Sequence, residues 1–396
     1  MLTETEIARL RAETPGADKV LHFNNAGAGL MPRAVLEAVK GHLDLEAETG
    51  GYEASAMREA ELARPYDAIA AYLNCGRDEI ALVENATVAW NQAFFAVLDG
   101  MSPGDRILTA EAEYASNYLS FLKAAGDRGV RVDVVPSDGD GALDVARLED
   151  LIDDRVRLIA VTHVPTNGGL VNPAEEIGRV ARAAGATYLL DACQSAGQMA
   201  LDVERIGCDF LSATGRKYLR GPRGTGFLYA SRRAMERYAP PVIDLRAAAW
   251  TAPDSFRWRD DAGRFENWEN YQAGRIGLGV AVDLMLETGI ERIEARVTEL
   301  ARILRERLAG IAGVTVRDLG RRRCGIVTFT HGSMPAGEVR STLGGQGINL
   351  SVSDAGSTLI DMTKRNLPDL VRASVHYYNT LEEVDRFVEA VARLGR

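Results

Sequence analysis

The chain has 396 residues, of which 46% are hydrophobic and 26% charged, and it carries a net charge of -10. This length is too great for one ordinary hydrophobic core, so we expect a globular protein of two domains. The acidic balance disfavours nucleic acid as a partner and suits a small metabolite.

Membrane insertion, export and metal binding are also disfavoured. The N-terminus is acidic and has no apolar segment of the signal-peptide type, and no apolar run approaches the length of a membrane span. The four cysteines are scattered without CxxC spacing, which is typical of free thiols in a reducing compartment. The five histidines form no i, i+4 pair and no Cys/His cluster. We therefore expect a cytoplasmic protein without a metal site.

Short β-branched runs alternate with helical patterns between about residue 80 and residue 230. This alternation predicts an α/β fold, in which helices cover a mainly parallel central sheet. One helix is expected to begin at Asn172 and Pro173, with the asparagine as its cap and the proline in its first turn. The strand-like runs cover residues 106–109, 130–135, 158–162, 188–190 and 226–229.

The pattern changes after residue 280. A long amphipathic helix is predicted over 290–308, followed by a strand-like run over 325–330. Thr380 and Glu383 form a capping box ahead of a closing apolar helix. These elements predict a smaller α+β domain at the C-terminal end. The expected division is a large domain of residues 20–275 and a small domain of residues 1–19 and 276–396.

Lys217 is the residue on which the functional interpretation depends. It follows Arg216 and precedes a glycine-rich segment, whose backbone can approach a bulky ligand closely. A lysine that acts as an amine nucleophile at neutral pH needs burial or cationic neighbours to lower its pKa. Upstream, an apolar strand ends in Asp191, at the sheet edge where α/β proteins bind ligands. Together these features indicate pyridoxal phosphate bound to the lysine as a Schiff base.

A phosphate site is predicted where Asn85, Ala86 and Thr87 open an apolar helix. Free N–H groups and a hydroxyl at a helix N-terminus suit a phosphate ester, although the same residues also fit a plain helix cap. Thr214 and Arg216 are expected as further phosphate donors, which favours the phosphate interpretation.

The cofactor ring has its own predicted contacts. Asp191 would pair with the pyridine nitrogen and keep it protonated, so that the ring accepts electrons from the substrate's α-carbon. Gln194 could donate to the phenolic oxygen, and Tyr114 could stack on the ring face. A helix-capping role for Asp191 and core packing for Tyr114 are the structural alternatives.

Arg372 lies inside an apolar strand, where its permanent charge needs an anionic partner. A substrate α-carboxylate held by both arms of the guanidinium would supply that anion. The alternative is a structural salt bridge.

These residues, in this order, resemble the class V aminotransferases, fold-type I pyridoxal phosphate enzymes that include the cysteine desulfurases. The resemblance runs from residues 23–27 to residues 372–380 and is most specific around Lys217. It implies the fold-type I architecture and a homodimer that binds a small amino-acid substrate. It further implies cofactor contacts at Ala86, Thr87, Tyr114, Asp191, Gln194, Thr214, Arg216 and Lys217, and substrate contacts at Asn25 and Arg372.

Two positions of the resemblance are less direct. Either Thr166 or Asn167 takes the place of the family's asparagine near the ring oxygen, and the choice stays open. Gln272 matches the position that reaches the phosphate of the other subunit across the dimer interface.

The expected reaction rests on one departure from the family. Desulfurases take sulfur onto a cysteine in the loop before the arginine strand, and here residues 347–358 contain no cysteine. A persulfide-forming desulfurase is therefore not expected, and β-elimination from a cysteine-derived substrate is the leading hypothesis. Transamination comes next, then epimerisation. A non-catalytic ligand sensor is a remote alternative.

Overall fold

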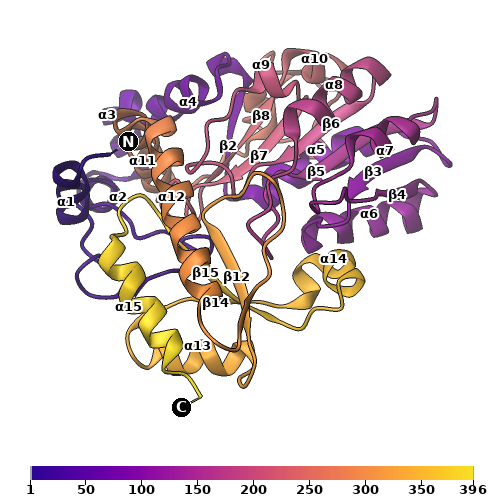
Figure 1. Ribbon diagram of the computed structural model, residues 1–396. Coiled ribbons are helices and arrows are strands. Elements are labelled where there is room, and N and C mark those ends of the chain that lie inside the picture. The colour runs from indigo at the N-terminus through magenta and orange to yellow at the C-terminus, as the bar shows by residue number, and fades with distance from the viewer. Residues whose placement is uncertain (1, 396) are drawn as a thin grey trace.

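The computed structural model describes residues 2–395, and its largest element is a seven-stranded sheet of order β2-β8-β7-β6-β5-β3-β4 (Figure 1). Adjacent strands from β4 to β7 are parallel, while β8 runs antiparallel to both β2 and β7. The expected α/β fold with a mainly parallel sheet is confirmed. The strands are β2 (Ile80–Val83), β3 (Arg106–Ala110), β4 (Arg131–Val135), β5 (Val156–Thr162), β6 (Thr187–Asp191), β7 (Phe210–Thr214) and β8 (Gly226–Ala230).

Helices cover both faces of this sheet, so its central strands are apolar on both sides. Along β5, Leu158 belongs to the cluster on one face and Ile159 to the cluster on the other, because successive side chains alternate. Trp90 of α5 and Phe121 of α6 pack together on the first face, and Ile177 of α8 packs on the second. The helices are α5 (Ala86–Asp99), α6 (Ala115–Arg128), α7 (Val145–Asp150), α8 (Ala174–Ala184), α9 (Val203–Ile206) and α10 (Arg232–Arg237).

One expected helix start is wrong in detail. Helix α8 begins at Ala174 after Pro173, and no side chain caps it. Asn172 is instead held by two other segments of the same chain. Its side-chain nitrogen donates to the carbonyl of Thr162 at 2.8 Å, and its side-chain oxygen accepts from the backbone N–H of Leu143 at 3.0 Å. These two hydrogen bonds pair both polar atoms of the side-chain amide, and the bond to Thr162 holds the end of β5 in place.

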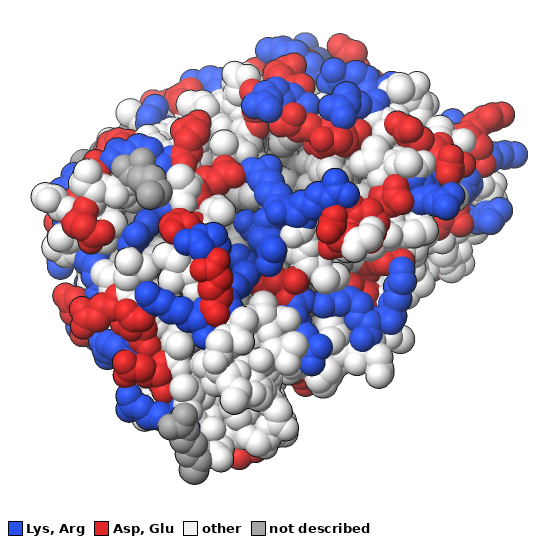
Figure 2. Space-filling view, viewed as in Figure 1, with Lys and Arg blue, Asp and Glu red and all other residues white. Residues whose placement is uncertain are grey.

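The C-terminal part forms a second sheet of four antiparallel strands, ordered β11-β12-β15-β14 (Figure 1, lower part). The predicted capping box of Thr380 and Glu383 is present at the start of α15. Figure 2 shows basic and acidic side chains interspersed over one face of the molecule, with an uncharged area near α13. The elements are α12 (Ile290–Ala309), β11 (Val314–Val316), β12 (Ile326–His331), α13 (Ala336–Gly344), β14 (Ser351–Ser353), α14 (Leu359–Lys364), β15 (Leu370–Ser374) and α15 (Leu381–Ala392).

The N-terminal segment packs against the C-terminal part. Arg11 donates to the carbonyl of Tyr378 and to Glu383, both at 2.9 Å, and β1 pairs in parallel with β13. None of the helices within residues 2–395 is long and apolar enough to cross a lipid bilayer. The exact domain boundaries stay a prediction. The remaining elements are α1 (Glu4–Ala12), β1 (Leu21–His22), α2 (Arg33–Thr49), α3 (Gly51–Met57), α4 (Glu59–Leu73), β9 (Ala248–Ala252), β10 (Ser255–Trp258), α11 (Gln272–Thr288), β13 (Ile348–Asn349) and three short 3₁₀ turns, η1 (Arg77–Glu79), η2 (Ala262–Phe265) and η3 (Ala355–Thr358).

Candidate active site

A cavity of about 420 Å³ lies at the carboxyl ends of the parallel strands. Thr162 ends β5 and Asp191 ends β6, so the sheet itself brings these two side chains to one edge, as is usual for ligand sites in α/β proteins. Eight of the predicted site residues line it. The lining consists of Asn85, Ala86, Thr87, Val88, Tyr114, Asn117, Thr162, Val164, Thr166, Asp191, Cys193, Gln194, Arg216 and Lys217.

Lys217 stands in the loop that follows β7. Burial is the main cause that lowers the pKa of its amine, and the nearby charges of Arg216 and Arg372 lower it further. The loop is packed tightly, since a Cβ on Gly197 would lie 2.4 Å from the backbone nitrogen of Leu219, and Gly197 has a φ of +92°. A rigid loop therefore presents an amine that is biased toward its neutral, nucleophilic form.

Asp191 is held by two hydrogen bonds at the floor of the cavity. Asn117 donates to one carboxylate oxygen at 3.0 Å, and the backbone N–H of Cys193 donates to the other at 2.8 Å. Burial raises the pKa of Asp191, while these two hydrogen bonds and the charge of Lys217 oppose that rise. A buried carboxylate in this state is stabilised by a cationic partner, and a protonated pyridine nitrogen is such a partner.

Glu113 is a second buried carboxyl, which the sequence analysis did not single out. It accepts from the backbone N–H of Thr162 at 2.9 Å and from Asn117 at 2.8 Å. Burial raises its pKa to about 7 despite these bonds, and the negative charge of Asp191 adds to the rise. Asn117 thus connects both carboxyls. The feature of the sequence that could have pointed to Asn117 was its position three residues after Tyr114, a predicted site residue.

The end of the cavity that is predicted to bind the phosphate contains the start of α5 and Arg216. Asn85 caps the helix by accepting from the N–H of Val88 at 3.1 Å, so the plain-cap interpretation holds for Asn85 itself. Ala86 and Thr87 follow it on the cavity wall. Thr214 does not line the cavity: its hydroxyl donates to the carbonyl of Thr225 and accepts from Arg216 at 3.3 Å. Thr214 therefore positions Arg216.

Arg372 reaches the same region from β15 of the other sheet. One arm of its guanidinium donates to the hydroxyl of Thr166 at 2.6 Å, while its Nε has no partner. Within residues 2–395 no carboxylate pairs with it, and burial lowers its pKa. The structural salt bridge that was the alternative is thus not formed. A buried guanidinium in this condition favours an anionic ligand.

The other predicted contacts differ in how they meet the cavity. Gln194 is 3% exposed, and its side-chain oxygen Oε1 has no hydrogen-bond partner, so a ligand on this wall could pair with it. Asn167 does not line the cavity and donates to the carbonyl of Asp354, whereas Thr166 does line it. Asn25 lies off the wall, with its amide bonded to Ser374 and Tyr378. Gln272, at the start of α11, is also not on the wall. The roles of all these residues stay predictions.

Taken together, the polar groups of the cavity fit pyridoxal phosphate. The start of α5 and Arg216 offer donors for its phosphate, Asp191 offers a buried anion for its ring nitrogen, and Lys217 offers an amine for its aldehyde. The unpaired oxygen of Gln194 and the unpaired Nε of Arg372 are two buried polar atoms that a bound ligand would satisfy.

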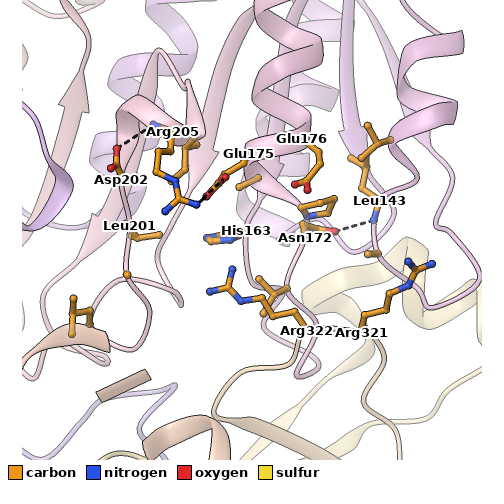
Figure 3. A pocket seen from close by; sticks show the side chains of 18 of the residues that line it. Leu143, His163, Asn172, Glu175, Glu176, Leu201, Asp202, Arg205, Arg321 and Arg322 are labelled. Atoms are coloured by element: carbon orange, nitrogen blue, oxygen red, sulfur yellow. Dashed lines mark hydrogen bonds and ion pairs between the residues drawn. The ribbon is translucent and has the colours of Figure 1, made fainter. Parts of the chain in front are cut away.

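A second and larger cavity, of about 1020 Å³, contains none of the predicted site residues (Figure 3). The buried ring of His163 lies there near Arg322, and Arg205 pairs with Glu175 at 2.9 Å. Burial lowers the pKa of His163 to about 3, so this imidazole is neutral. The cavity lacks an amine nucleophile, so its greater size does not make it the catalytic site.

Comparisons with known proteins find relatives over most of the chain. A model of the aminotransferase class V family matches residues 21–387. A probable cysteine desulfurase of Methanothermobacter thermautotrophicus is 32% identical, over 87% of this chain and 86% of the relative. A cysteine desulfurase of Serratia proteamaculans is 31% identical over 98% of both chains. The solved apo structure of a cysteine desulfurase from Thermococcus onnurineus has a TM-score of 0.91 at 27% identity, and covers 98% of this chain and 97% of its own.

The raised pKa of Glu113 predicts a specific pH dependence of stability. Because its pKa is about 7 in the folded protein against 4.5 ordinarily, the folded state holds an extra proton, and stability falls as pH rises through that interval. One group contributes at most about 3 kcal/mol to this fall. We expect Glu113→Gln, whose side chain stays neutral, to flatten this part of the curve of unfolding free energy against pH. Urea denaturation of the protein without pyridoxal phosphate (PLP) measures that curve. Glu382→Gln, at an exposed position, should leave the curve unchanged. An unaltered slope in Glu113→Gln would contradict the assignment.

Proposed function

Because the chain belongs to the aminotransferase class V family, which makes it a pyridoxal phosphate-dependent enzyme, we propose that it removes the sulfur atom of L-cysteine in a desulfurase-type reaction. The observation that carries this proposal is the cavity of about 420 Å³ that Lys217 and Asp191 both line, close to Arg372, whose guanidinium has no carboxylate partner within residues 2–395. Relatives named cysteine desulfurase, similar over most of their length, support the choice of substrate.

The sequence-based exclusion of a desulfurase is wrong. It depended on the absence of a cysteine from residues 347–358. The relatives and the solved structure that carry the name cysteine desulfurase contradict it. A loop lacking a thiol says nothing about the groups that act at the α-carbon, and it does not exclude a thiol elsewhere in the fold. The preference for β-elimination, with transamination and epimerisation behind it, is therefore dropped.

Pyridoxal phosphate, when bound, supplies an electron sink for the negative charge that develops at the substrate's α-carbon. The residues of the chain would hold the reacting groups in place. Ala86, Thr87 and Arg216 would bind the phosphate, and Asp191 would keep the ring nitrogen protonated.

Lys217 and Arg372 would act on the substrate. Lys217 would remove the α-proton of the substrate, because its lowered pKa keeps the amine in its basic form. Arg372 would grip the carboxylate through donors that have no acidic partner within residues 2–395. The small volume of the cavity, about 420 Å³, suits a small amino acid beside the cofactor.

A homodimer is part of the proposal. Several large apolar side chains are exposed, including Tyr52 at 76% and Trp250 at 77%, and such surface favours contact with a partner. Gln272 lies off the wall of its own cavity, which fits a contact to the phosphate of the other subunit. A second copy of the chain would cover the apolar side chains and complete both cavities.

The cytoplasm is the proposed location. All four cysteines are free, which fits a reducing compartment. Cell fractionation with an antibody to the chain tests this, and recovery outside the cytoplasmic fraction would contradict it.

The reaction is tested with Lys217→Ala. The wild-type holoenzyme should convert L-cysteine to alanine and sulfide in the presence of a dithiol, and the variant should lose this turnover because it lacks the amine. Lys364→Ala, a change of an exposed lysine on α14, is the matched control and should remain active. Amino-acid analysis measures the alanine. Pyruvate and ammonia in place of alanine would rule out the desulfurase reaction.

Arg372→Ala tests the carboxylate site. Hydrogen bonds to a charged group contribute about 1.5–3 kcal/mol, so kcat/KM for L-cysteine should fall roughly ten- to a hundredfold. Arg372→Lys keeps the charge but loses the planar fork, and its kcat/KM should lie between those of the alanine variant and the wild type. Steady-state kinetics decide the matter, and equal values for all three proteins would remove Arg372 from the substrate site.

The shared cavities are tested by mixing two variants. Lys217→Ala supplies an intact Gln272, and Gln272→Ala supplies an intact Lys217. A mixed dimer contains one site with both native residues only if Gln272 acts across the interface. PLP affinity of Gln272→Ala should therefore be weak alone and partly restored after subunit exchange with Lys217→Ala. Light scattering should give the mass of two chains. A monomer, or no restoration, would refute the shared site.

A further inference from the structure

Removal of the sulfur of cysteine as a transferable atom requires a thiol that attacks it. No cysteine occurs in residues 347–358, so that segment cannot provide the attacking group. The remaining thiols of the chain are those of Cys75, Cys193, Cys208 and Cys324. Their positions relative to the cavity around Lys217 decide which of them can meet a substrate.

Cys193 lies in that cavity. It follows β6 by two residues, and its backbone N–H is fixed on Asp191 at 2.8 Å. Its side chain is partly buried on the wall that Lys217 also lines.

The other three cysteines do not line this cavity. Cys208 and Cys324 are buried within the apolar core at 4% and 1% exposure. Cys75 packs, partly buried, against the main apolar cluster. Among the described residues, Cys193 is thus the thiol within reach of a ligand held at Lys217.

An independent feature marks this cavity as a binding site. The side-chain oxygen Oε1 of Gln194, the residue after Cys193, has no hydrogen-bond partner although the residue is only 3% exposed. Buried polar atoms of this kind are ordinarily paired, so a ligand in the cavity would complete the pairing. The thiol therefore belongs to a wall built around a ligand.

Cys193 and Lys217 form a pair suited to proton transfer. Burial raises the pKa of the Cys193 thiol, and burial lowers the pKa of the Lys217 amine, so both groups favour their neutral forms. A neutral amine on the same cavity wall as a neutral thiol is placed to take the thiol's proton as the sulfur attacks. The raised pKa alone would leave the thiol unreactive, and the adjacent base removes that obstacle.

We propose that Cys193 is the sulfur acceptor of the enzyme, an assignment that rests on the desulfurase-type reaction proposed above. Its Sγ attacks the Sγ of the bound L-cysteine, so that an S–S bond forms while the substrate's Cβ–Sγ bond breaks. The bonding electron pair goes to the substrate side. Cβ gains the thiol's proton through Lys217, which has by then given up the α-proton that is restored to Cα in alanine. The products are alanine and a persulfide on Cys193. The two sulfur atoms are oxidised as Cβ is reduced, so no outside oxidant is needed. An added dithiol then releases sulfide and becomes a disulfide.

The test is mass spectrometry after a single turnover. Wild-type holoenzyme is mixed with one equivalent of sulfur-labelled L-cysteine without reductant, alkylated with iodoacetamide and digested. We expect the peptide that contains Cys193 to be heavier by one labelled sulfur atom, and alanine to form in equal amount. Label on Cys75, Cys208 or Cys324 instead, or on no cysteine while alanine and sulfide still form, overturns the assignment and leaves the proposed function standing.

Two variants separate the acceptor from a packing role. Cys193→Ala and Cys193→Ser should bind pyridoxal phosphate, as seen in the visible absorbance, and should melt near the wild-type temperature, yet release little sulfide from L-cysteine. Cys75→Ser is the matched control and should keep both label and sulfide release. Full sulfide release by either Cys193 variant overturns the assignment. Absence of alanine in the wild type would instead sink the desulfurase reaction itself.

Discussion

The site depends on the burial of one basic and one acidic side chain in the same small cavity. Lys217 and Asp191 each suffer from burial, which pushes the lysine toward its neutral amine and opposes the charge of the aspartate. Hydrogen bonds to the aspartate and close packing around the lysine offset this destabilisation. Asn117 and the N–H of Cys193 hold the carboxylate, and the tightly packed loop after β7 holds the lysine. A cofactor with a cationic ring and an aldehyde relieves both groups at once, which is why the cavity suits pyridoxal phosphate.

The second requirement is that two sheets meet. The parallel sheet supplies the lysine and aspartate, while Arg372 comes from β15 of the antiparallel sheet and is bonded to Thr166 of the large sheet's loops. The N-terminal segment reinforces this junction, since Asn25 donates at 2.8 Å to the carbonyl of Ser374, the last residue of β15. The cofactor and substrate ends of the site are thereby kept in register by contacts between segments that are hundreds of residues apart.

The absent loop cysteine illustrates how a correct observation can support a wrong exclusion. The loop from residue 347 to residue 358 has no thiol, as its sequence shows. A desulfurase is excluded only if the loop is the one place in the fold that can hold a sulfur-accepting thiol. In the folded protein Cys193 stands beside Lys217, at a distance along the chain of more than a hundred and fifty residues from that loop. The chemistry of a cavity is set by every segment that lines it.

Sequence alone determined the features that are local or periodic. The alternation of strands and helices, the capping box at Thr380, the helix start at Ala86 and the choice of Lys217 and Asp191 as candidate site residues all follow from residue types within a few positions of each feature. Tertiary structure decided the rest. It directed Asn172 to Thr162 and Leu143 in place of a helix cap, and it turned Thr214 away from the cavity. It also placed Glu113 and Asn117 behind Asp191, and Cys193 on the same cavity wall as Lys217. The physical reason is that a polar side chain takes the best partner that packing brings to it, and those partners come from distant segments whose proximity no local pattern encodes.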